Sequence, residues 1–463
     1  MSELNIFMPD KLEQGFSPLK YKSQFDLWGM ACLYQGVCMY DEDLNLSNRL
    51  AENVFHAERY MEIKIKPLTW HDGAPITAED FKFSFELCYA PSESGRIPNR
   101  IIEHIEGARS FYGGKSGDIS GIKLLDERTI RIYHNAPGVY VQSLLTLPIM
   151  PMHCHNQATT QYVGSGSFVL KSILENNAHF VKNEGFCLGT PQVDELFLKG
   201  GTTFEQRHYL QEGSIDLTVM EADELLKLPV SVFRNYDVYT LPQPVSTVMK
   251  INPDSKLFFD LSARKRVSQK ISRGLLVHQL FHNYADSMVQ FYPPVVAQHL
   301  NCTLIYPNVA PTQTRLRTIR VGVHKQKKEH RNVAEMLAKM LKPDFSVSID
   351  EYSSRDEAYR SGADLYIENM NHALIPCSNP YIYSNRNAFL KDPEYVHLLE
   401  LDESLYRNNY HDFIRKYAEE IASILPVIPL YSKHEIQLVS KRVQHLRPDT
   451  RGAFWNIHEI SVT

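Results

Sequence analysis

The clearest pattern of hydrophobic and polar positions lies between Tyr60 and Cys88. Its first six residues alternate at period two, which predicts a half-buried strand with three inward apolar side chains, Met61, Ile63 and Ile65. Thr77 is placed to cap a helix, because acidic residues follow it in the first turn. Residues spaced i, i+4 and i+7 then form one apolar helical face, Phe81, Phe85 and Cys88. The segment therefore predicts strand, turn and helix.

A second clear pattern lies in residues 318–369. Alternation over 319–323 predicts a strand, helical spacing over 333–341 an amphipathic helix, and alternation over 345–349 a second strand. Leu365 and Ile367 predict a third strand. This order indicates a parallel sheet with right-handed crossovers. Ligands bind beyond the carboxyl ends of such strands. We therefore expect a ligand site at those ends, His324-Lys325 and residues 368–371, with Glu368, Asn369 and Asn371 as the residues that contact ligand.

Shorter patterns predict further elements along the chain. They are a strand at 4–7, an apolar helix ending near Tyr34-Gln35-Gly36, a hairpin of strands 121–125 and 129–133, a strand at 167–173, a helix ending at Gly213 before a buried strand, a helical tail at 402–424 and a last strand at 435–440. No internal repeat or flexible linker separates them, so interleaved lobes are expected.

Composition narrows the class of protein. A chain of 463 residues predicts two to four domains, and 43% hydrophobic with 22% charged residues is typical of a globular protein. The net charge of -5 gives no electrostatic reason to expect direct binding to nucleic acid. No apolar run reaches the ~18 residues of a spanning helix, so no membrane insertion is expected. The N-terminus carries no export signal, and seven cysteines without a CxxC pair favour a reducing compartment. We expect a cytoplasmic protein, with removal of a signal peptide as the alternative.

Several segments together resemble one family, the extracellular solute-binding proteins of the peptide and nickel uptake class (family 5). The resembling segments are HDGAPITAED at 71–80, LYQGVCMYDEDLNLSNRLAENV at 33–54, GSGSF at 164–168 and ILPVIPLYSKHEIQLVSKRVQHL at 424–446. The resemblance implies an α/β fold of the periplasmic-binding-protein type (class II, cluster C), with two lobes, an additional domain and a hinged ligand cleft. It implies solute binding without catalysis, and it adds Tyr34 and Gln35 as candidate ligand contacts.

The same resemblance predicts the domain boundaries. Lobe 1 is expected to comprise 1–40, 160–242 and 433–463, with an accessory domain inserted at 41–159 and lobe 2 at 243–432. Hinges are expected near 240–245 and 428–434. Ligand bound between the lobes is expected to favour a closed form.

The chain also departs from the family pattern. Serines replace the usual threonine and proline in Gly164-Ser165-Gly166-Ser167-Phe168, and the segment ISRGLL at 271–276 lacks the usual acidic residue before its arginine. Residues 363–381 read ADLYIENMNHALIPCSNPY, without the aspartate that holds the peptide amine in the family's dipeptide binders. A peptide is therefore a less obvious ligand.

Segments of the C-terminal half carry a narrower resemblance. VHKQKKEHRNVAEMLAKML at 323–341, ADLYIENMNHALIP at 363–376 and RGAFWNIHEI at 451–460 are similar to the solute-binding domain of SgrR-type regulators, which act in sugar-phosphate stress. That resemblance implies a ligand-sensing module for a sugar-related or peptide ligand, partnered by a winged-helix DNA-binding domain. The alternative function is the substrate-binding protein of an ABC importer, partnered by a permease.

Other candidate chemistry was weighed against structural roles. On a strand, Met152-His153-Cys154-His155 would place two histidines on one face, but a closed zinc site uses four ligands, so no metal and no cofactor are expected. His71-Asp72 is either an acid–base pair or, as the family implies, part of a turn. No G-x-S-x-G elbow is present, so we expect no enzyme. The lysines at 325, 327 and 328 are expected at a solvated helix start, and Trp455 within lobe 1.

Overall fold

A computed structural model of the chain provides the structure. The residues that it describes are 2–13, 15–19, 23–41, 45–90, 102, 104–135, 141–155, 162–299, 317–372, 412, 415–416, 418–419, 422, 425–448 and 456–463. Within these ranges, no helix combines the length and the apolar character needed to cross a membrane. The predicted helical tail at 402–424 and Trp455 lie wholly or mostly outside the described residues.

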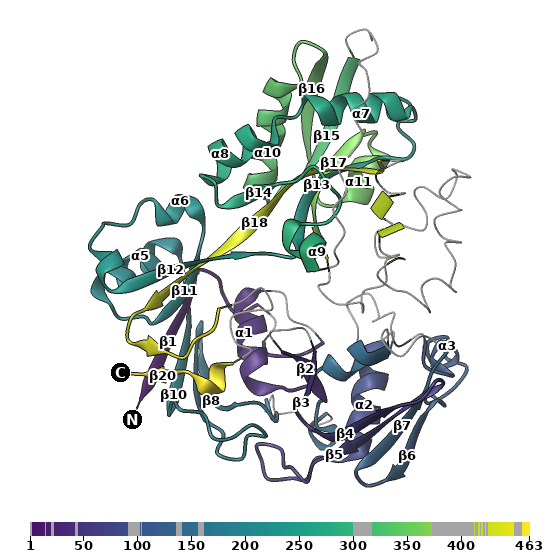
Figure 1. The fold of residues 1–463 in the computed structure, drawn as a ribbon, viewed down its shortest axis with the longest axis vertical. Helices are drawn as coiled ribbons and strands as arrows, with labels where there is room; N and C mark the ends of the chain where they lie inside the picture. The colour runs from purple at the N-terminus through teal and green to yellow at the C-terminus, as the bar shows by residue number, and fades with distance from the viewer. Residues whose placement is uncertain are drawn as a thin grey trace. The chain divides into compact units, whose positions relative to one another are not determined.

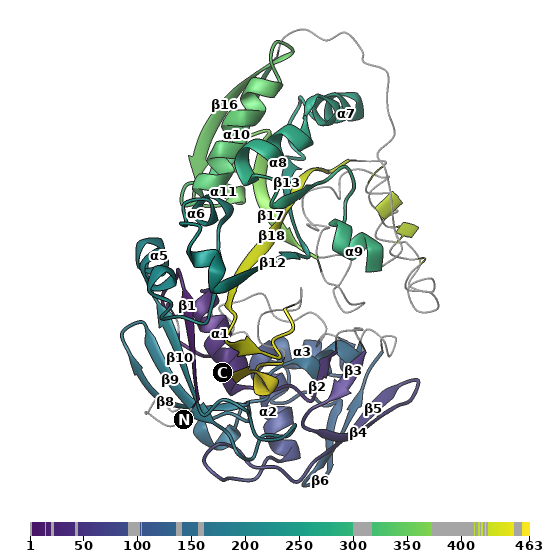
Figure 2. The same ribbon diagram turned by 60° about the vertical axis from the view of Figure 1, so that its left-hand side comes forward.

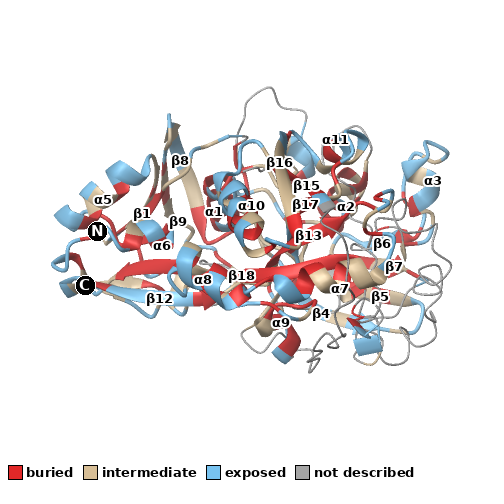
Figure 3. Ribbon diagram, turned by 90° about the horizontal axis from the view of Figure 1, so that it is seen from above, coloured by how far each residue is buried: buried red, intermediate tan, exposed pale blue. Residues whose placement is uncertain are grey.

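The chain forms two compact units. Unit 1 comprises Met1–Leu241 with Ile436–Thr463, and unit 2 comprises Pro242–Glu435. The chain passes from one unit to the other within two strands, β12 (Tyr236–Pro242) and β18 (Val427–Ser440). Figure 3 shows β18 buried along most of its length. A separate accessory domain at 41–159, and hinges at the two crossings, stay predictions.

A mixed sheet forms the core of unit 1. Strand β1 is parallel to β10 on one side and to β11 on the other, as Figure 1 shows for the purple β1. Strands β10, β9 and β8 continue as an antiparallel meander, and the end of β18 pairs antiparallel with β11. The inward residues of these strands are fully buried because alternation directs them to one face, as for Leu4, Ile6, Phe180, Leu196, Leu198 and Leu217. The elements are β1 (Glu3–Met8), α1 (Gln24–Leu33), β8 (Phe168–Leu174), β9 (Asn177–Lys182), β10 (Glu195–Gly200), α5 (Thr203–Glu212), β11 (Leu217–Met220), α6 (Ala222–Leu225) and η4 (Val232–Arg234).

Residues 60–65 of the segment from Tyr60 to Cys88 lie in a second, antiparallel sheet of unit 1. This sheet has the order β4-β5-β7-β6, and helix α2 follows β5. The predicted strand, turn, helix and 121–133 hairpin are all confirmed, with Thr77 as the N-cap and with Phe81 and Phe85 fully buried. Two further pairs, β2 with β3 and β19 with β20, form separate two-stranded sheets. The remaining elements of unit 1 are β2 (Cys38–Tyr40), β3 (Leu46–Asn48), β4 (Ala51–His56), β5 (Tyr60–Ile65), α2 (Ala78–Tyr89), α3 (Ala108–Tyr112), β6 (Ile122–Asp126), β7 (Thr129–Tyr133), η2 (Gln142–Thr146), η3 (Met152–Cys154), β19 (Val443–Gln444), η6 (Ile457–Glu459) and β20 (Ser461–Val462).

Unit 2 is built on a sheet with the order β16-β15-β17-β13-β18, and β14 also pairs with β18. Strand β15 is parallel to both β16 and β17, which confirms the predicted parallel β-α-β arrangement. Figure 2 shows α10, the connecting helix, beside β16, with which it packs. The elements are β13 (Val245–Ile251), α7 (Leu261–Lys270), α8 (Arg273–Phe281), β14 (Ala285–Ser287), α9 (Pro294–His299), β15 (Arg317–His324), α10 (Lys328–Met340), β16 (Phe345–Tyr352), α11 (Arg355–Arg360) and β17 (Leu365–Asn371).

Residues 152–154 form a 3-10 turn between Pro151 and His155 rather than a strand, so the alternation considered for the two histidines does not apply. The expected end of the third strand of unit 2 is wrong. Strand β17 continues to Asn371 because its whole length pairs antiparallel with β13. The polar residues expected beyond the strand end therefore lie within the strand.

Candidate ligand-binding site

The three polar residues predicted at the end of β17 do not share one face. Successive side chains of a strand point to opposite sides, so Glu368 faces one side of the sheet and Asn369 and Asn371 face the other. Their contacts agree with this alternation. Glu368 contacts Arg355 of α11, whereas Asn369 contacts His330 of α10. The structure therefore brings Asn369 and Asn371 together and separates Glu368 from both.

Glu368 belongs to a buried charge cluster. Its carboxylate lies 3.1 Å from the Lys250 ammonium and 3.0 Å from the Arg355 guanidinium. The Lys250 side chain is only 7% exposed. Burial lowers the pKa of Lys250, and the neighbouring Glu368 carboxylate opposes that shift. The geometry indicates that Glu368 compensates the buried Lys250 cation, since an unpaired buried charge is strongly unfavourable.

On the other face, Asn369 is the centre of a neutral polar cluster. Its Oδ1 accepts hydrogen bonds from the Thr247 hydroxyl at 3.0 Å and from His330 Nε2 at 3.1 Å. His330 is 2% exposed, and its Nδ1 has no hydrogen-bond partner among the described residues. Burial lowers the pKa of His330, so its ring is neutral near pH 7. This cluster offers hydrogen bonds without a net charge.

The first turn of α10 adds an ion pair next to this cluster. Glu329 accepts hydrogen bonds from the Tyr431 hydroxyl at 2.7 Å and from Lys433 Nζ at 2.8 Å. Burial would raise the pKa of Glu329, but Lys433 and Tyr431 hold it below its ordinary value. Glu329 and His330 are adjacent in α10, so the ion pair and the neutral cluster are connected through the backbone. The sequence analysis missed Thr247, Glu329, His330 and Lys433, although the helix start after β15 could have indicated the two α10 residues.

Tyr34 and Gln35 lie in unit 1, directly after α1. Tyr34 is half-buried against the core of unit 1, and burial raises the pKa of its hydroxyl. The Gln35 side chain donates to the Tyr34 carbonyl at 3.0 Å, and the Gln35 carbonyl accepts from the Ile149 amide. Their contacts fix the end of α1. As ligand contacts they stay a prediction.

Both ring nitrogens of His71 form hydrogen bonds with the glycine segment at 164–168. Its Nδ1 accepts from the Gly164 amide at 3.3 Å and its Nε2 donates to the Gly166 carbonyl at 3.1 Å. Burial lowers the pKa of His71, which agrees with a neutral ring that both accepts and donates. A Cβ on Gly164 would lie 1.9 Å from the Leu33 carbonyl oxygen, so only glycine fits there. His71 therefore joins the turn at 70–75 to the glycine segment, as the turn interpretation requires.

The strand, turn and helix of residues 60–89 and the parallel β-α-β arrangement of unit 2 are the elements expected of the periplasmic-binding-protein fold. Comparison with known proteins supports this class. The sequence profile of the bacterial extracellular solute-binding proteins, family 5 Middle, matches residues 45–387. The chain belongs to this family.

Relatives and solved structures agree with this assignment. A probable deoxycholate-binding periplasmic protein of Escherichia coli is 23% identical over 54% of this chain and 49% of its own length. A putative ABC transporter peptide-binding protein of Brucella ovis is 22% identical over 59% of this chain and 51% of its own length. The chain therefore spans about half the length of these curated relatives. The crystal structure of Haemophilus influenzae OppA in complex with RPPGFSPFR matches with a TM-score of 0.76 at 17% identity, over 100% of this chain and 99% of that chain.

Proposed function

We propose that this protein binds a small solute, a peptide or another small molecule, and delivers it to an ABC permease outside the cytoplasm. Membership of the solute-binding family across 45–387 is the observation that carries the proposal. The relatives named above support it, because their names describe a periplasmic protein and an ABC transporter protein. Neither is named as an enzyme. The cytoplasmic location expected from the cysteines finds no support in these names.

We further propose that the solute contacts Asn369 and Asn371. The neutral groups around Asn369 suit amide or hydroxyl groups of a solute, because they offer hydrogen bonds without charge compensation. They suit a free ammonium group poorly. Glu368 has both cationic partners in place, so we propose that it positions strand β17 rather than contacting solute. Tyr34 and Gln35 remain proposed contacts from the family resemblance alone.

The sensor function suggested by the SgrR-type resemblance is a weaker proposal. It rests on the three sequence segments, and the relatives named above are binding proteins, not regulators. The two functions differ in gene context. An adjacent permease gene and an export signal in the reading frame would support the importer protein. A winged-helix segment in the same reading frame would overturn it in favour of the regulator.

Native mass spectrometry of the purified protein will identify a retained solute, and calorimetry will then measure its affinity for variants. Asn369→Ala and Asn371→Ala are each expected to weaken binding about tenfold, the effect of one lost hydrogen bond to a buried partner. Asn235→Ala, an exposed asparagine of unit 1, is the matched control and should bind as the wild type does. Wild-type affinity in both Asn369→Ala and Asn371→Ala would show that the solute binds elsewhere.

A further inference from the structure

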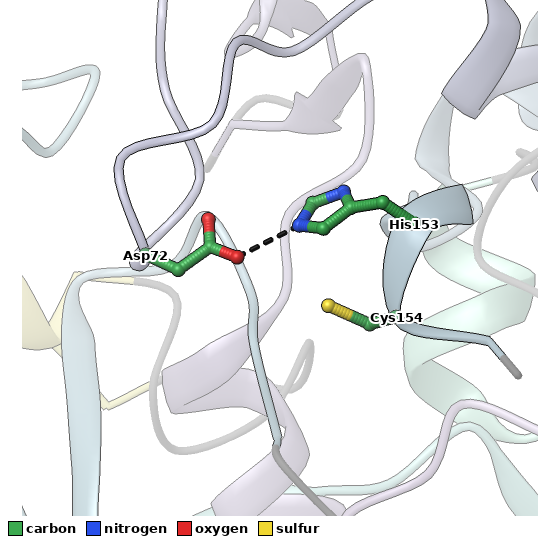
Figure 4. Close-up of side chains that lie close together, drawn as sticks. All are labelled: Asp72, His153 and Cys154. Carbon is green, nitrogen blue, oxygen red and sulfur yellow. Dashed lines mark hydrogen bonds and ion pairs between the residues drawn. The ribbon is translucent and has the colours of Figure 1, made fainter. Parts of the chain in front are cut away.

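Three potential metal ligands from two separate segments of unit 1 come together. They are Asp72, in the turn after β5, and His153 and Cys154, in the 3-10 turn η3. One ligand atom from each lies within 4.8 Å of the others, and Figure 4 shows the three side chains directed toward the same space. His153 Nε2 lies 2.7 Å from Asp72 Oδ2. An oxygen, a nitrogen and a sulfur donor therefore face one point.

The local backbone holds each ligand in place. Asp72 Oδ1 accepts from the Ala74 amide at 3.1 Å, which leaves Oδ2 directed at His153. Gly73 makes this turn possible with a φ of 89°, in the left-handed region. The amide of Cys154 donates to the Pro151 carbonyl within the 3-10 turn. The ligands thus sit on two short, hydrogen-bonded turns.

Buried Asp80 fixes the two turns relative to each other. Its Oδ2 accepts from the Thr77 amide at 2.9 Å and from Trp70 Nε1 at 3.3 Å, so it holds both ends of the turn that carries Asp72. Its Oδ1 accepts from the Met152 amide at 2.9 Å, directly before His153. Such support of the ligand-bearing backbone is what a preorganised metal site requires.

We propose that Asp72, His153 and Cys154 bind one divalent transition-metal ion of the Zn²⁺ type, with a remaining coordination position open to solvent. A mixed O, N, S donor set suits Zn²⁺, Co²⁺ or Ni²⁺ and is unsuited to Mg²⁺ and Ca²⁺, which take oxygen ligands. Donors of a tetrahedral zinc ion lie roughly 3.3–3.7 Å apart, as follows from metal–ligand distances of about 2.0–2.3 Å. Binding requires His153 Nε2 and Asp72 Oδ2, now 2.7 Å apart, to separate to that spacing, and their side chains are 38% and 36% exposed.

The site is accessible from outside unit 1. Asp72 lines a surface hollow of about 650 Å³ together with His71, Tyr162 and the β8 residues Val169–Ile173. An open coordination position there would admit water or a chelating group of a small molecule. Three protein ligands plus an exchangeable fourth position is the arrangement of accessible zinc sites, in contrast to closed structural ones.

The test uses the full chain after treatment with a chelator. Zn²⁺ is titrated in competition with a chromophoric chelator, and Co²⁺ is added separately as a spectroscopic probe. One Zn²⁺ per chain is expected, and bound Co²⁺ should show a sulfur-to-metal charge-transfer band. Asp72→Asn, His153→Gln and Cys154→Ser should each weaken Zn²⁺ binding about tenfold or more, since even an outer partner of a ligand contributes that much. Cys154→Ser should also abolish the charge-transfer band.

His155→Gln is the matched control. The His155 ring packs on Phe83 at a centroid distance of 5.0 Å, outside the set of three ligands, so Zn²⁺ affinity should be unchanged. Thermal unfolding of each apo variant checks that its fold is intact. The proposal is wrong if the chain does not bind stoichiometric Zn²⁺, if His155→Gln weakens binding as much as His153→Gln, or if Cys154→Ser retains the charge-transfer band.

Discussion

Asp80 of unit 1 and Glu368 of unit 2 are both carboxylates within polar clusters, but their partners differ. Asp80 is 4% exposed and accepts hydrogen bonds from neutral donors, two of them backbone amides. Glu368 is paired with two cations, Lys250 and Arg355. The first carboxylate holds chain segments in a defined conformation, whereas the second compensates charge under a sheet.

The two carboxylates also differ in how far along the sequence their partners lie. The partners of Asp80 include Thr77, within the family segment at 71–80, and Trp70, directly before it. Glu368 has one partner nearby in sequence, Arg355 of α11, 13 residues away. The Asn369 partners in α10 and β13 are 39 and 122 residues away. A motif can therefore reveal the scaffold of unit 1, while the polar clusters of unit 2 depend on packing of several elements.

The largest expected effect is that of Asp80→Ala. It leaves the part-buried amides of Thr77 and Met152 and the buried Trp70 indole without their acceptor, and hydrogen bonds to a charged group contribute about 1.5–3 kcal/mol each. We expect a loss of about 4 kcal/mol in the free energy of unfolding of unit 1. Urea denaturation followed by tryptophan fluorescence measures it, because none of the three tryptophans lies within 242–435.

Glu79→Ala is the control for this prediction. Glu79 precedes Asp80 in the same helix turn and is exposed, so its loss should change the unfolding free energy by less than about 0.5 kcal/mol. If Asp80→Ala were as mild as Glu79→Ala, the two turns would not depend on Asp80. The preorganisation argued for the metal site would then lose its basis.

Acidification is expected to act on unit 2 through His372. Burial lowers the pKa of His372 to about 3, below the 6.5 of an exposed histidine, so the unfolded chain takes up the proton first. The contribution of neutral His372 to the free energy of unfolding is fully present above pH 6.5 and is lost as the pH falls toward 3. The expected loss between pH 7 and pH 4 is about 3 kcal/mol. Hydrogen exchange of peptides from 242–299 and 317–372 measures this loss.

The histidine-specific part of the acid effect is isolated by His372→Gln. Its glutamine can still contact the Ser246 hydroxyl, which lies 2.6 Å from His372 Nε2, but cannot take up a proton. The pH dependence of unit 2 should therefore flatten in this variant, whatever its stability at pH 7. His208→Gln changes an exposed histidine of unit 1, so the pH dependence of unit 2 should be unchanged in this control variant. Equal acid sensitivity of wild type and His372→Gln would contradict the assignment.

Glu368→Gln is expected to have a smaller effect, about 2 kcal/mol on the stability of unit 2. It removes the carboxylate that compensates Lys250, a buried cation, while Arg355 stays close by. The control is Glu351→Gln, which removes an exposed pair with Arg331 and should cost less than about 1 kcal/mol. Hydrogen exchange of the β13 and β17 peptides is the measurement. A variant as stable as its control would mean that Lys250 finds other compensation.

Local pattern was sufficient to predict much of the fold. Alternation and helical spacing predicted β5, α2, the β6–β7 hairpin and the β15-α10-β16 unit, because these elements bury one face of a continuous segment. The pattern was insufficient at 152–155, where four residues between prolines and a turn have no period to read. It also ended β17 too early, since only pairing with β13 extends that strand to Asn371.

The candidate sites were only partly predictable. The sequence drew attention to Asn369 and Asn371, but it grouped them with Glu368, because polar residues close together in the chain look alike until the strand alternation is known. It weighed the histidines at 153 and 155 as a pair of metal ligands and predicted no metal there. The structure instead places Asp72, 81 residues earlier than His153, against that histidine.

The sequence by itself determined the family, the order of the elements and the turn around Asp80, because these depend on contacts between residues close together in the chain. Only the tertiary structure decided which polar groups meet: Asn369 with His330 and Thr247, Glu368 with Lys250, and Asp72 with His153 and Cys154. These contacts depend on which face of the sheet each strand residue occupies and on which turns a buried carboxylate holds together. Both are products of packing between distant segments, which local periodicity does not contain.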